Sequence, residues 1–194
     1  MHFVIYGPEG SGKGTQAKLL AQALSLPVYT SGDLVREAAT ADTKDIGNVC
    51  REALNSGKYV PDKQMFILWD KKLAGSEARK GFISDGFPRN IKQAKFFLRK
   101  AKEYGYNIDK VIYLKLTDEE AYIRLAKRNR KLFEGSAVSH DTPERISKRL
   151  EIYRVNEKEA VKFFRQKKML LEINGNGTID EVFNKIKVEL KICP

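Results

Sequence analysis

The sequence predicts an α/β fold, with a parallel five-stranded sheet and helices on both of its faces. Five short apolar runs of strand length alternate along the chain with stretches of helical periodicity. The first run, residues 3–6, leads directly into a glycine-rich loop, which a helical pattern follows. Because strands that alternate with helices form right-handed βαβ units, the strands are expected to lie parallel in one sheet.

Length and composition fit a single domain, residues 1–194, with small inserted segments. No apolar run approaches the roughly 18 residues of a membrane helix, and Cys50 and Cys193 form no metal-spaced or redox motif. We therefore expect a cytoplasmic protein that has no membrane partner. The net charge of +11 favours a polyanionic partner, either nucleic acid or a phosphate-rich small molecule. The alternative is that the excess charge belongs only to a solvated, lysine-rich surface.

The first 56 residues contain two of the strands and two or more helices. The first strand is followed by a helix over about residues 14–24, in which alanine and leucine recur on one face. A second strand is expected at residues 27–29. A helical block over residues 33–56 follows it, and Asp42 and Gly47 interrupt this block.

The remaining elements alternate in the same way. Pro61 fits the first turn of a helix that runs toward Leu73. Three further strands are expected at residues 81–84, 111–114 and 170–173.

Helix starts in the second half are marked by capping sequences. Thr117 and Thr178 each open a capping box, in which Thr binds the amide three residues on and Glu reaches back. Asp141 is expected to cap a long helix that runs to about Lys168. The least patterned segment, residues 129–140, is expected to be a mobile loop.

The strongest chemical signal is the loop Gly7-Pro8-Glu9-Gly10-Ser11-Gly12-Lys13-Gly14-Thr15, which lies between a strand and a helix. Its glycines let successive backbone N–H groups point at one anion, and the helix N-terminus adds partial positive charge. Lys13 is placed to reach the β- and γ-phosphates of a nucleotide. The fold is therefore expected to be of the P-loop NTPase type. The loop residues expected to bind ATP are Gly10, Ser11, Gly12, Lys13, Gly14 and Thr15.

The order Gly-Lys-Gly-Thr-Gln at residues 12–16 resembles the phosphate loop of adenylate kinases and their UMP/CMP kinase relatives, the nucleoside monophosphate (NMP) kinases. It differs from GTPases, in which a Ser or Thr directly after the Lys ligates Mg²⁺. The resemblance extends over nearly the whole chain. It implies an adenylate kinase of the short-lid form, which transfers a phosphoryl group reversibly from ATP to AMP with Mg²⁺ and gives two ADP.

Three further segments resemble the acceptor site of this family. They are Thr-Ser-Gly-Asp-Leu-Val-Arg at residues 30–36, Gly-Lys-Tyr-Val-Pro-Asp at residues 57–62 and Asp-Gly-Phe-Pro-Arg at residues 85–89. The third directly follows a predicted strand, at the sheet edge where ligands of such folds bind. The resemblance implies that Asp85 orients Mg²⁺ through water. It implies that AMP is bound by Ser31, Arg36, Lys58, Tyr59, Val60, Gly86, Phe87, Pro88, Arg89, Gln93 and Arg149.

The base of the acceptor is indicated by Gln93. An amide side chain can pair with the amino group and a ring nitrogen of adenine. The related pyrimidine kinases tend to have Asn there, so Gln93 favours AMP. A UMP/CMP kinase of the same fold remains the nearest alternative.

Further arginines resemble those of the family's donor site and lid. Arg124 and Arg128 are four residues apart on a predicted helix and share a face. They resemble the arginines that open the lid, and Arg149 resembles the one that follows it. By resemblance Arg128 and Gly177 also bind ATP. The residues expected to be catalytic are Lys13, Arg89, Arg124, Arg128 and Arg149. The NMP-binding segment is expected at about residues 30–60 and the short lid at about residues 128–141.

The lid departs from the family pattern. The family usually ends it with Arg-x-Asp-Asp, whereas residues 138–141 read Val-Ser-His-Asp. Only Asp141 remains, and Val138 stands where the arginine would be. Our hypothesis is that Arg130 or Lys131 supplies the charge. The lid is too short and lacks the cysteines for a structural zinc, which is therefore not expected.

The expected mechanism needs no general base, because an AMP phosphate oxygen is already anionic at neutral pH. Catalysis would rest on Mg²⁺ and a ring of six cations, the five named as catalytic together with Arg36, which would also give the positive charge a local purpose. ATP and AMP are the expected partners of a monomer. The alternative of another class is a basic nucleotide-binding ATPase that acts on nucleic acid. It leaves the Asp-Gly-Phe-Pro-Arg segment unexplained, and the aromatic and basic interleaving of RNA-binding proteins does not occur.

Overall fold

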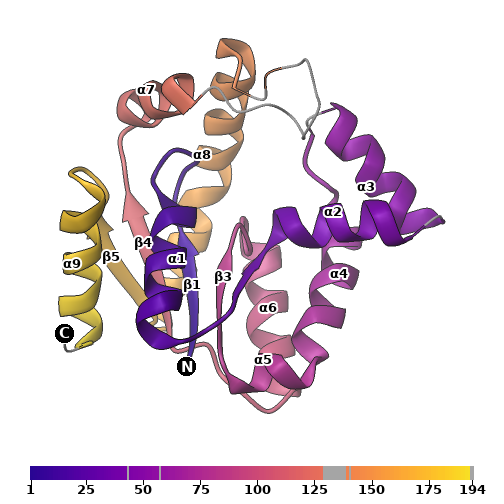
Figure 1. Cartoon of the computed structure of the whole chain (residues 1–194), viewed down its shortest axis with the longest axis horizontal. Helices are drawn as coiled ribbons and strands as arrows, with labels where there is room; N and C mark the ends of the chain where they lie inside the picture. Colours follow the sequence, from indigo (N-terminus) through magenta and orange to yellow (C-terminus); the bar gives the residue numbers. More distant parts are fainter. Residues whose placement is uncertain (43, 57, 129–138, 140, 193–194) are drawn as a thin grey trace.

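The computed structural model of the chain describes residues 1–42, 44–56, 58–128, 139 and 141–192. Its centre is one five-stranded sheet in the order β2-β3-β1-β4-β5, and every neighbouring pair of strands is parallel (Figure 1). The strands are β1 (His2–Tyr6), β2 (Val28–Thr30), β3 (Phe82–Asp85), β4 (Lys110–Lys115) and β5 (Leu170–Asn174). The predicted parallel sheet is confirmed, and each strand end lies within one residue of its expected position.

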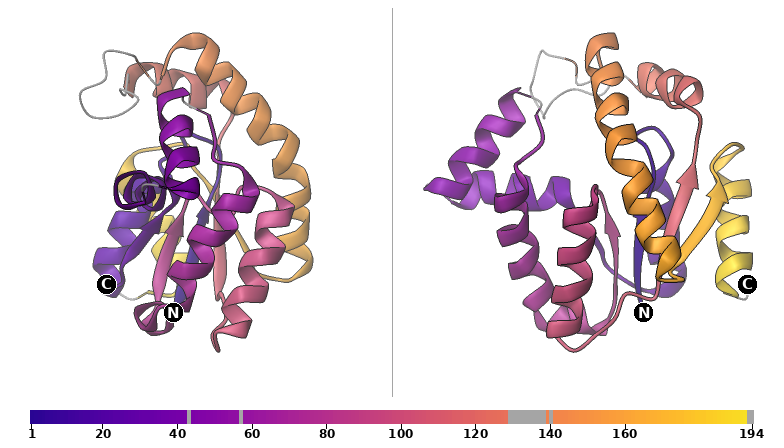
Figure 2. Two further views of the ribbon diagram at one scale, coloured as in Figure 1. Left: turned by 90° about the vertical axis from the view of Figure 1, so that its right-hand side faces the viewer. Right: turned by 180° about the vertical axis from the view of Figure 1, so that it is seen from behind.

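Helices cover both faces of the sheet, as predicted (Figures 1 and 2). Side chains alternate along each strand, so that Ile5 packs toward one face and Val4 toward the other. The face that carries Ile5 is covered by α1 (Lys13–Leu24) and α9 (Ile179–Leu190), and the opposite face by α4 (Asp62–Ala74), α6 (Ile91–Glu103) and α8 (Pro143–Gln166). A short helix, α5 (Ser76–Lys80), precedes β3. Across the ranges that the structure describes, no helix combines the length and the apolar character needed to cross a bilayer.

The expected helical block over residues 33–56 forms two helices, α2 (Ser31–Ala41) and α3 (Asp45–Ser56). The chain breaks where the sequence indicated, at Asp42, whose carboxylate accepts hydrogen bonds from the amides of Lys44 (2.7 Å) and Gly47 (3.2 Å). A Cβ atom at Gly47 would lie 1.7 Å from the carbonyl oxygen of Asp42, so this position tolerates no side chain. Figure 1 shows α2 and α3 on one side of the carboxyl ends of the strands, and α7 (Asp118–Arg128) with the start of α8 on the other.

One of the two predicted capping boxes forms completely. At α9, Thr178 accepts from the amide of Glu181 (3.3 Å), and the Glu181 carboxylate accepts from the amide of Thr178 (2.8 Å). At α7, Thr117 accepts from the amide of Glu120 (3.3 Å). The expected return bond of Glu120 is wrong, because its carboxylate instead binds Arg124 at 2.6 Å.

The predicted cap of α8 is also wrong. Thr142, not Asp141, is the N-cap, and its hydroxyl accepts from the amide of Arg145. The carboxylate of Asp141 turns away from the helix and binds Arg128 and Arg149. Charge-assisted hydrogen bonds from guanidinium groups are stronger than the single bond that one amide of the helix could offer.

Candidate functional site

The glycine-rich loop curls between β1 and α1 as its sequence predicts. Gly10 and Gly12 adopt left-handed φ angles of 86° and 85°, which residues with a side chain rarely adopt. A Cβ atom at Gly10 would lie 2.8 Å from the carbonyl oxygen of Ala121, so the loop fits closely under α7. The ammonium of Lys13 folds back over the loop and donates to the carbonyl of Pro8 at 2.7 Å. The ammonium of Lys13 therefore lies against the backbone of the glycine-rich loop.

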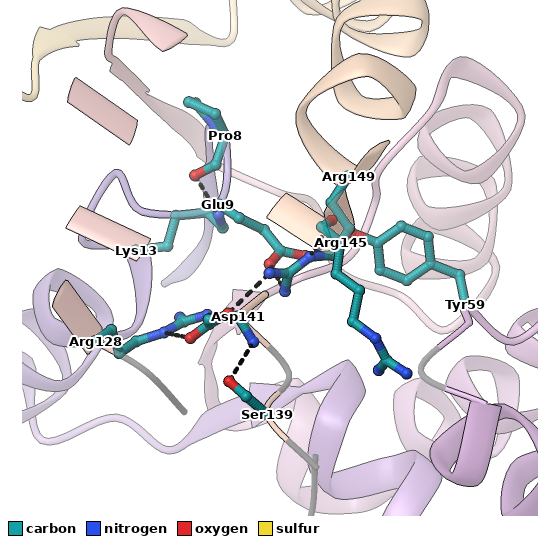
Figure 3. Close-up of polar contacts among 9 residues, drawn as sticks. All are labelled: Pro8, Glu9, Lys13, Tyr59, Arg128, Ser139, Asp141, Arg145 and Arg149. Atoms are coloured by element: carbon teal, nitrogen blue, oxygen red, sulfur yellow. Dashed lines mark hydrogen bonds and ion pairs between the residues drawn. The ribbon is translucent and has the colours of Figure 1, made fainter. Parts of the chain in front are cut away.

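Four of the predicted cations gather beside this loop, and each comes from a different part of the chain. Figure 3 shows three of the four, all but Arg89. They are Lys13, Arg89, Arg128 and Arg149. Burial lowers the pKa of the Lys13 ammonium, and the charges of Asp85 and Glu9 partly offset this effect. The predicted convergence of Lys13, Arg89 and Arg128 is therefore present in the folded chain.

Asp141 holds two of these cations together. Its side chain is fully buried, with an exposed fraction of 0%. It accepts two hydrogen bonds from Arg128, both at 2.8 Å, and one from Arg149, also at 2.8 Å. The pair with Arg128 is bidentate, which fixes the plane of that guanidinium. Asp141 therefore positions arginines that arrive from α7 and α8.

Glu9 is a site residue that the sequence analysis did not identify. One oxygen of its carboxylate accepts from the hydroxyl of Tyr59 at 2.5 Å, and the other accepts from Arg149 at 2.6 Å (Figure 3). Burial raises the pKa of Glu9, but the charge of Arg149, followed by that of Arg89, outweighs burial and lowers the pKa to about 2. The signal in the sequence was an acidic residue inside a loop built to bind anions.

Arg89 is positioned by its own turn. Its Nε donates to the carbonyl oxygen of Gly86 at 2.9 Å, and its guanidinium lies 4.2 Å from the centre of the Tyr59 ring. Gly86 adopts a φ of 78°, which bends the chain directly after β3. The predicted acceptor residues Tyr59, Gly86 and Arg89 are thus neighbours.

Gln93, expected to contact the acceptor base, is buried with both ends of its amide occupied. Its Oε1 accepts from the amide of Arg89 at 2.7 Å, and its Nε2 donates to Asp62 at 2.6 Å. Asp62 also accepts from Asn90. These contacts fix the plane of the amide and leave one lone pair of Oε1 and one N–H of Nε2 for a base.

Ser31 is held in a similar way. Its hydroxyl donates to the carbonyl of Gly86 at 2.8 Å and accepts from the indole N–H of Trp69 at 3.3 Å. Trp69, which is fully buried, stacks on Phe87 with 4.7 Å between ring centres. The start of α2, the helix α4 and the turn after β3 therefore form one connected wall.

The two remaining cations of the expected ring each pair with a carboxylate of their own helix. Arg36 pairs with Asp33 at 2.7 Å, and its side chain is 58% exposed. Arg124 pairs with Glu120 and donates to the carbonyl of Gly175 at 3.1 Å, which connects α7 to the loop before α9. Charge pairing on the two flanking helices therefore holds Arg36 and Arg124 in this structure, and their place in the ring of six cations stays a prediction.

The sequence of this chain is similar to those of known adenylate kinases over nearly its whole length. The adenylate kinase family model matches residues 5–169. Adenylate kinase 1 of Nostoc is 35% identical over 187 residues, which are 96% of this chain and 97% of that protein. The adenylate kinase of Thermobifida fusca is 36% identical over 191 residues, 98% of each chain. That of Xylella fastidiosa is 33% identical over 190 residues, 98% of this chain and 99% of its own.

This chain belongs to the adenylate kinase family. The resemblance inferred from the sequence is confirmed, and so is the activity class, an NMP kinase that transfers a phosphoryl group between ATP and AMP. The roles of single residues in this member of the family remain predictions, which the geometry of the site supports to different degrees.

For an adenylate kinase, Asp85 is the residue of greatest interest for Mg²⁺. It ends β3 and lies in register with Ile5 of β1 and Thr30 of β2. A Cβ atom at Gly14 would lie 3.4 Å from its carboxylate, which places Asp85 beside the first turn of α1. Burial raises the pKa of Asp85, and the charge of Lys13 opposes this effect. A half-buried carboxylate beside the phosphate loop suits a hard cation, so the site fits Mg²⁺.

Other ligands of such an ion would have to come from water and phosphate oxygens, as is usual for Mg²⁺. Within the described residues, no group of three or more His, Cys, Asp or Glu side chains is arranged to hold a metal ion.

The other predicted residues of this adenylate kinase lie around the cluster or outside the described chain. Lys58 is exposed, Val60 is buried, and Thr15 is exposed on the first turn of α1. Gly177, in the loop before α9, has a φ of 120°, which favours glycine. The hypothesis that Arg130 or Lys131 supplies the missing lid charge stays a prediction, since these two residues and Val138 lie outside the described residues.

Proposed function

We propose that this chain transfers the terminal phosphoryl group of ATP to AMP inside the cluster of Lys13, Arg89, Arg128 and Arg149. The observation that carries the proposal is the gathering of these four cations beside the phosphate loop, at the carboxyl ends of parallel strands. Ligands of open α/β folds bind at this edge. A compact group of cations is the arrangement that two phosphate chains, meeting end to end, require.

The chain contributes charge and position, not a base. Lys13 would bind the β- and γ-phosphates of ATP from the helix side, with the loop amides around it. Arg89 and Arg149 would hold the AMP phosphate, whose oxygen attacks while it is anionic. Arg128 would stabilise the charge of the transferring group. Mg²⁺, when bound, would neutralise charge on the ATP phosphates, and Asp85 would hold it through water.

The acceptor would lie between the NMP-binding segment, about residues 30–60, and the turn after β3. The wall formed by Ser31, Trp69 and Phe87 supports this assignment. Closure of the segment over AMP would exclude water, which otherwise competes as the acceptor. The short lid at about residues 128–141 remains a prediction, because most of it lies outside the described residues.

The donor would extend toward Gly177, past Arg124. The bond from Arg124 to the carbonyl of Gly175 supports this direction, since it fixes the loop that the adenine of ATP would meet. A monomeric, cytoplasmic enzyme without a membrane or nucleic-acid partner remains a prediction from the sequence.

The test is ADP formation from Mg-ATP, measured with and without AMP, and with CMP, UMP or GMP in its place. We expect two ADP for each ATP consumed in the presence of AMP, and negligible ADP without an acceptor. A faster reaction with CMP or UMP would identify a pyrimidine kinase. ADP formed without any acceptor, and stimulated by RNA or DNA at low salt, would support the nucleic-acid-dependent ATPase instead.

A further inference from the structure

Glu9 places a negative charge in the loop that is built to bind negative phosphates. Its carboxylate joins three segments, the phosphate loop that carries it, Tyr59 after α3 and Arg149 on α8 (Figure 3). Arg89 lies over the Tyr59 ring, and its charge helps to lower the pKa of Glu9. The carboxylate therefore lies among groups that we assign to the acceptor phosphate.

Every nitrogen of Arg149 already donates to an acceptor of the protein. Its Nε donates to the carbonyl of Arg145 at 3.1 Å, one terminal nitrogen donates to Glu9 at 2.6 Å, and the other donates to Asp141 at 2.8 Å. Its side chain is only 7% exposed. These bonds use three of the five N–H groups of the guanidinium, and so little of it faces solvent that a phosphate gains its closest contact by taking the place of one of these acceptors.

Of the two carboxylates on Arg149, Glu9 is the one that can leave. Asp141 is fully buried and also binds Arg128 through two hydrogen bonds. The side chain of Glu9 is 22% exposed, and its neighbour Gly10 has a left-handed backbone. Its second partner, Tyr59, is 39% exposed. Glu9 can thus swing toward solvent without breaking the pairs of Asp141.

We propose that Glu9 is an internal anion, which occupies the place of the acceptor phosphate in the free enzyme and is displaced when the nucleotide binds. Its charge keeps the cations from repelling one another while the site is empty. A doubly charged phosphate group replaces it, whereas a weaker anion does not. Because Glu9 also binds Tyr59, its displacement releases the acceptor segment from the phosphate loop. This inference rests on the proposed acceptor role of Arg89 and Arg149.

The test compares AMP with adenosine, which lacks the phosphate, by titration calorimetry on the wild type and on Glu9→Gln. Gln keeps the shape of Glu9, but a neutral acceptor binds Arg149 about half as strongly as a charged one. We expect AMP to bind Glu9→Gln at least about threefold more tightly, on the same argument. The affinity for adenosine should be equal in the two proteins, or undetectable in both. Glu77→Gln is the matched control, because it removes the same charge from an exposed pair with Lys80.

AMP affinity that is unchanged or weaker in Glu9→Gln would overturn the proposal, and would show that Glu9 orients Arg149 for the substrate. Equal tightening of AMP and adenosine, or of AMP in Glu77→Gln, would overturn it as well. If Glu9→Gln does not fold, Tyr59→Phe replaces it. This variant keeps the ring under Arg89 but loses the bond to Glu9, so it should also tighten AMP and not adenosine. Failure of the wild type to bind AMP at all would count against the proposed function.

Discussion

Replacing Asp141 with Asn tests the carboxylate on which the arrangement of two arginines depends. In the wild type, three guanidinium hydrogen bonds of 2.8 Å end on this fully buried side chain. Asn offers a single acceptor oxygen, and its NH₂ group, which can only donate, would face the N–H donors of Arg128 or Arg149. Arg149 would then keep its charge in a site from which one of its two carboxylates has gone.

The magnitude follows from the burial of each partner. Arg149, whose side chain is 7% exposed, cannot replace the lost bond with water. Arg128, at 38% exposed, can do so in part, and its contribution is discounted accordingly. Breaking a buried pair by neutralising one partner costs about 3–5 kcal/mol, and we take about 3 kcal/mol, the lower end, for Asp141→Asn. For a chain of this length that corresponds to a fall in Tm of roughly 6–12 °C.

The assay is urea unfolding at neutral pH, with kcat measured on the same preparations. Asp118→Asn is the matched control, because Asp118 pairs with Arg154 between the same two helices but at the surface, where the side chains are 41% and 54% exposed. The control should stay within about 0.5 kcal/mol of the wild type. A loss below about 1 kcal/mol in Asp141→Asn, or an equal loss in Asp118→Asn, would refute the reasoning from burial.

Three further predictions concern activity and pH. Lys13→Met should lower kcat by roughly 10²–10³, the loss seen when one donor to a transferring group is removed, and a change below about tenfold would contradict its role. Arg124→Ala should raise KM for ATP by about tenfold and leave KM for AMP unchanged, since its bond fixes the Gly175 carbonyl on the donor side, and equal rises in both would argue against that side. Asp85→Asn should lower Mg²⁺-dependent kcat but raise Tm at pH 7. Burial raises the pKa of Asp85, so the folded state is destabilised as pH rises through that pKa. The difference in Tm should vanish in acid, where the carboxyl is protonated in both states, and a lower Tm for Asp85→Asn at pH 7 would contradict this sign.

The sheet could be predicted from the sequence because its signals are local. Each strand is an apolar run of strand length, and turn residues such as Gly7 or Pro27 limit most of these runs. The positions of the strands therefore depend little on tertiary contacts. The break between α2 and α3 is local too, since the carboxylate of Asp42 binds amides two and five residues ahead.

The misplaced cap of α8 has the opposite cause. In Asp141-Thr142-Pro143-Glu144 both of the first two residues are good N-caps, and the local signals conflict: Glu144 at the third helical position would favour Asp141, whereas Pro143 at the first would favour Thr142. The choice is made by Arg128, 13 residues before Asp141, and by Arg149, 8 residues after it. No local pattern could show that these arginines would meet.

Glu9 escaped prediction for the same reason. Its partners, Tyr59 and Arg149, are 50 and 140 residues away along the chain. The sequence could show that a carboxylate stood in the phosphate loop, but not that it was paired. Arg36 and Arg124 are the converse case, because the carboxylates that hold them, Asp33 and Glu120, lie within one helical turn and were visible in the sequence.

These contacts change the explanation of the basic composition. Among the described residues, the four cations of the cluster face the three carboxylates of Glu9, Asp85 and Asp141, so the formal sum at the site is four minus three, or +1. The net charge of the chain is +11, so most of the excess positive charge lies outside this cluster. Phosphate binding then depends on exchange: a substrate anion gains only the difference between its own bonds to the arginines and those of the carboxylate that it displaces. An affinity set by such a difference can be tuned by one carboxylate without loss of the cations that catalyse the transfer.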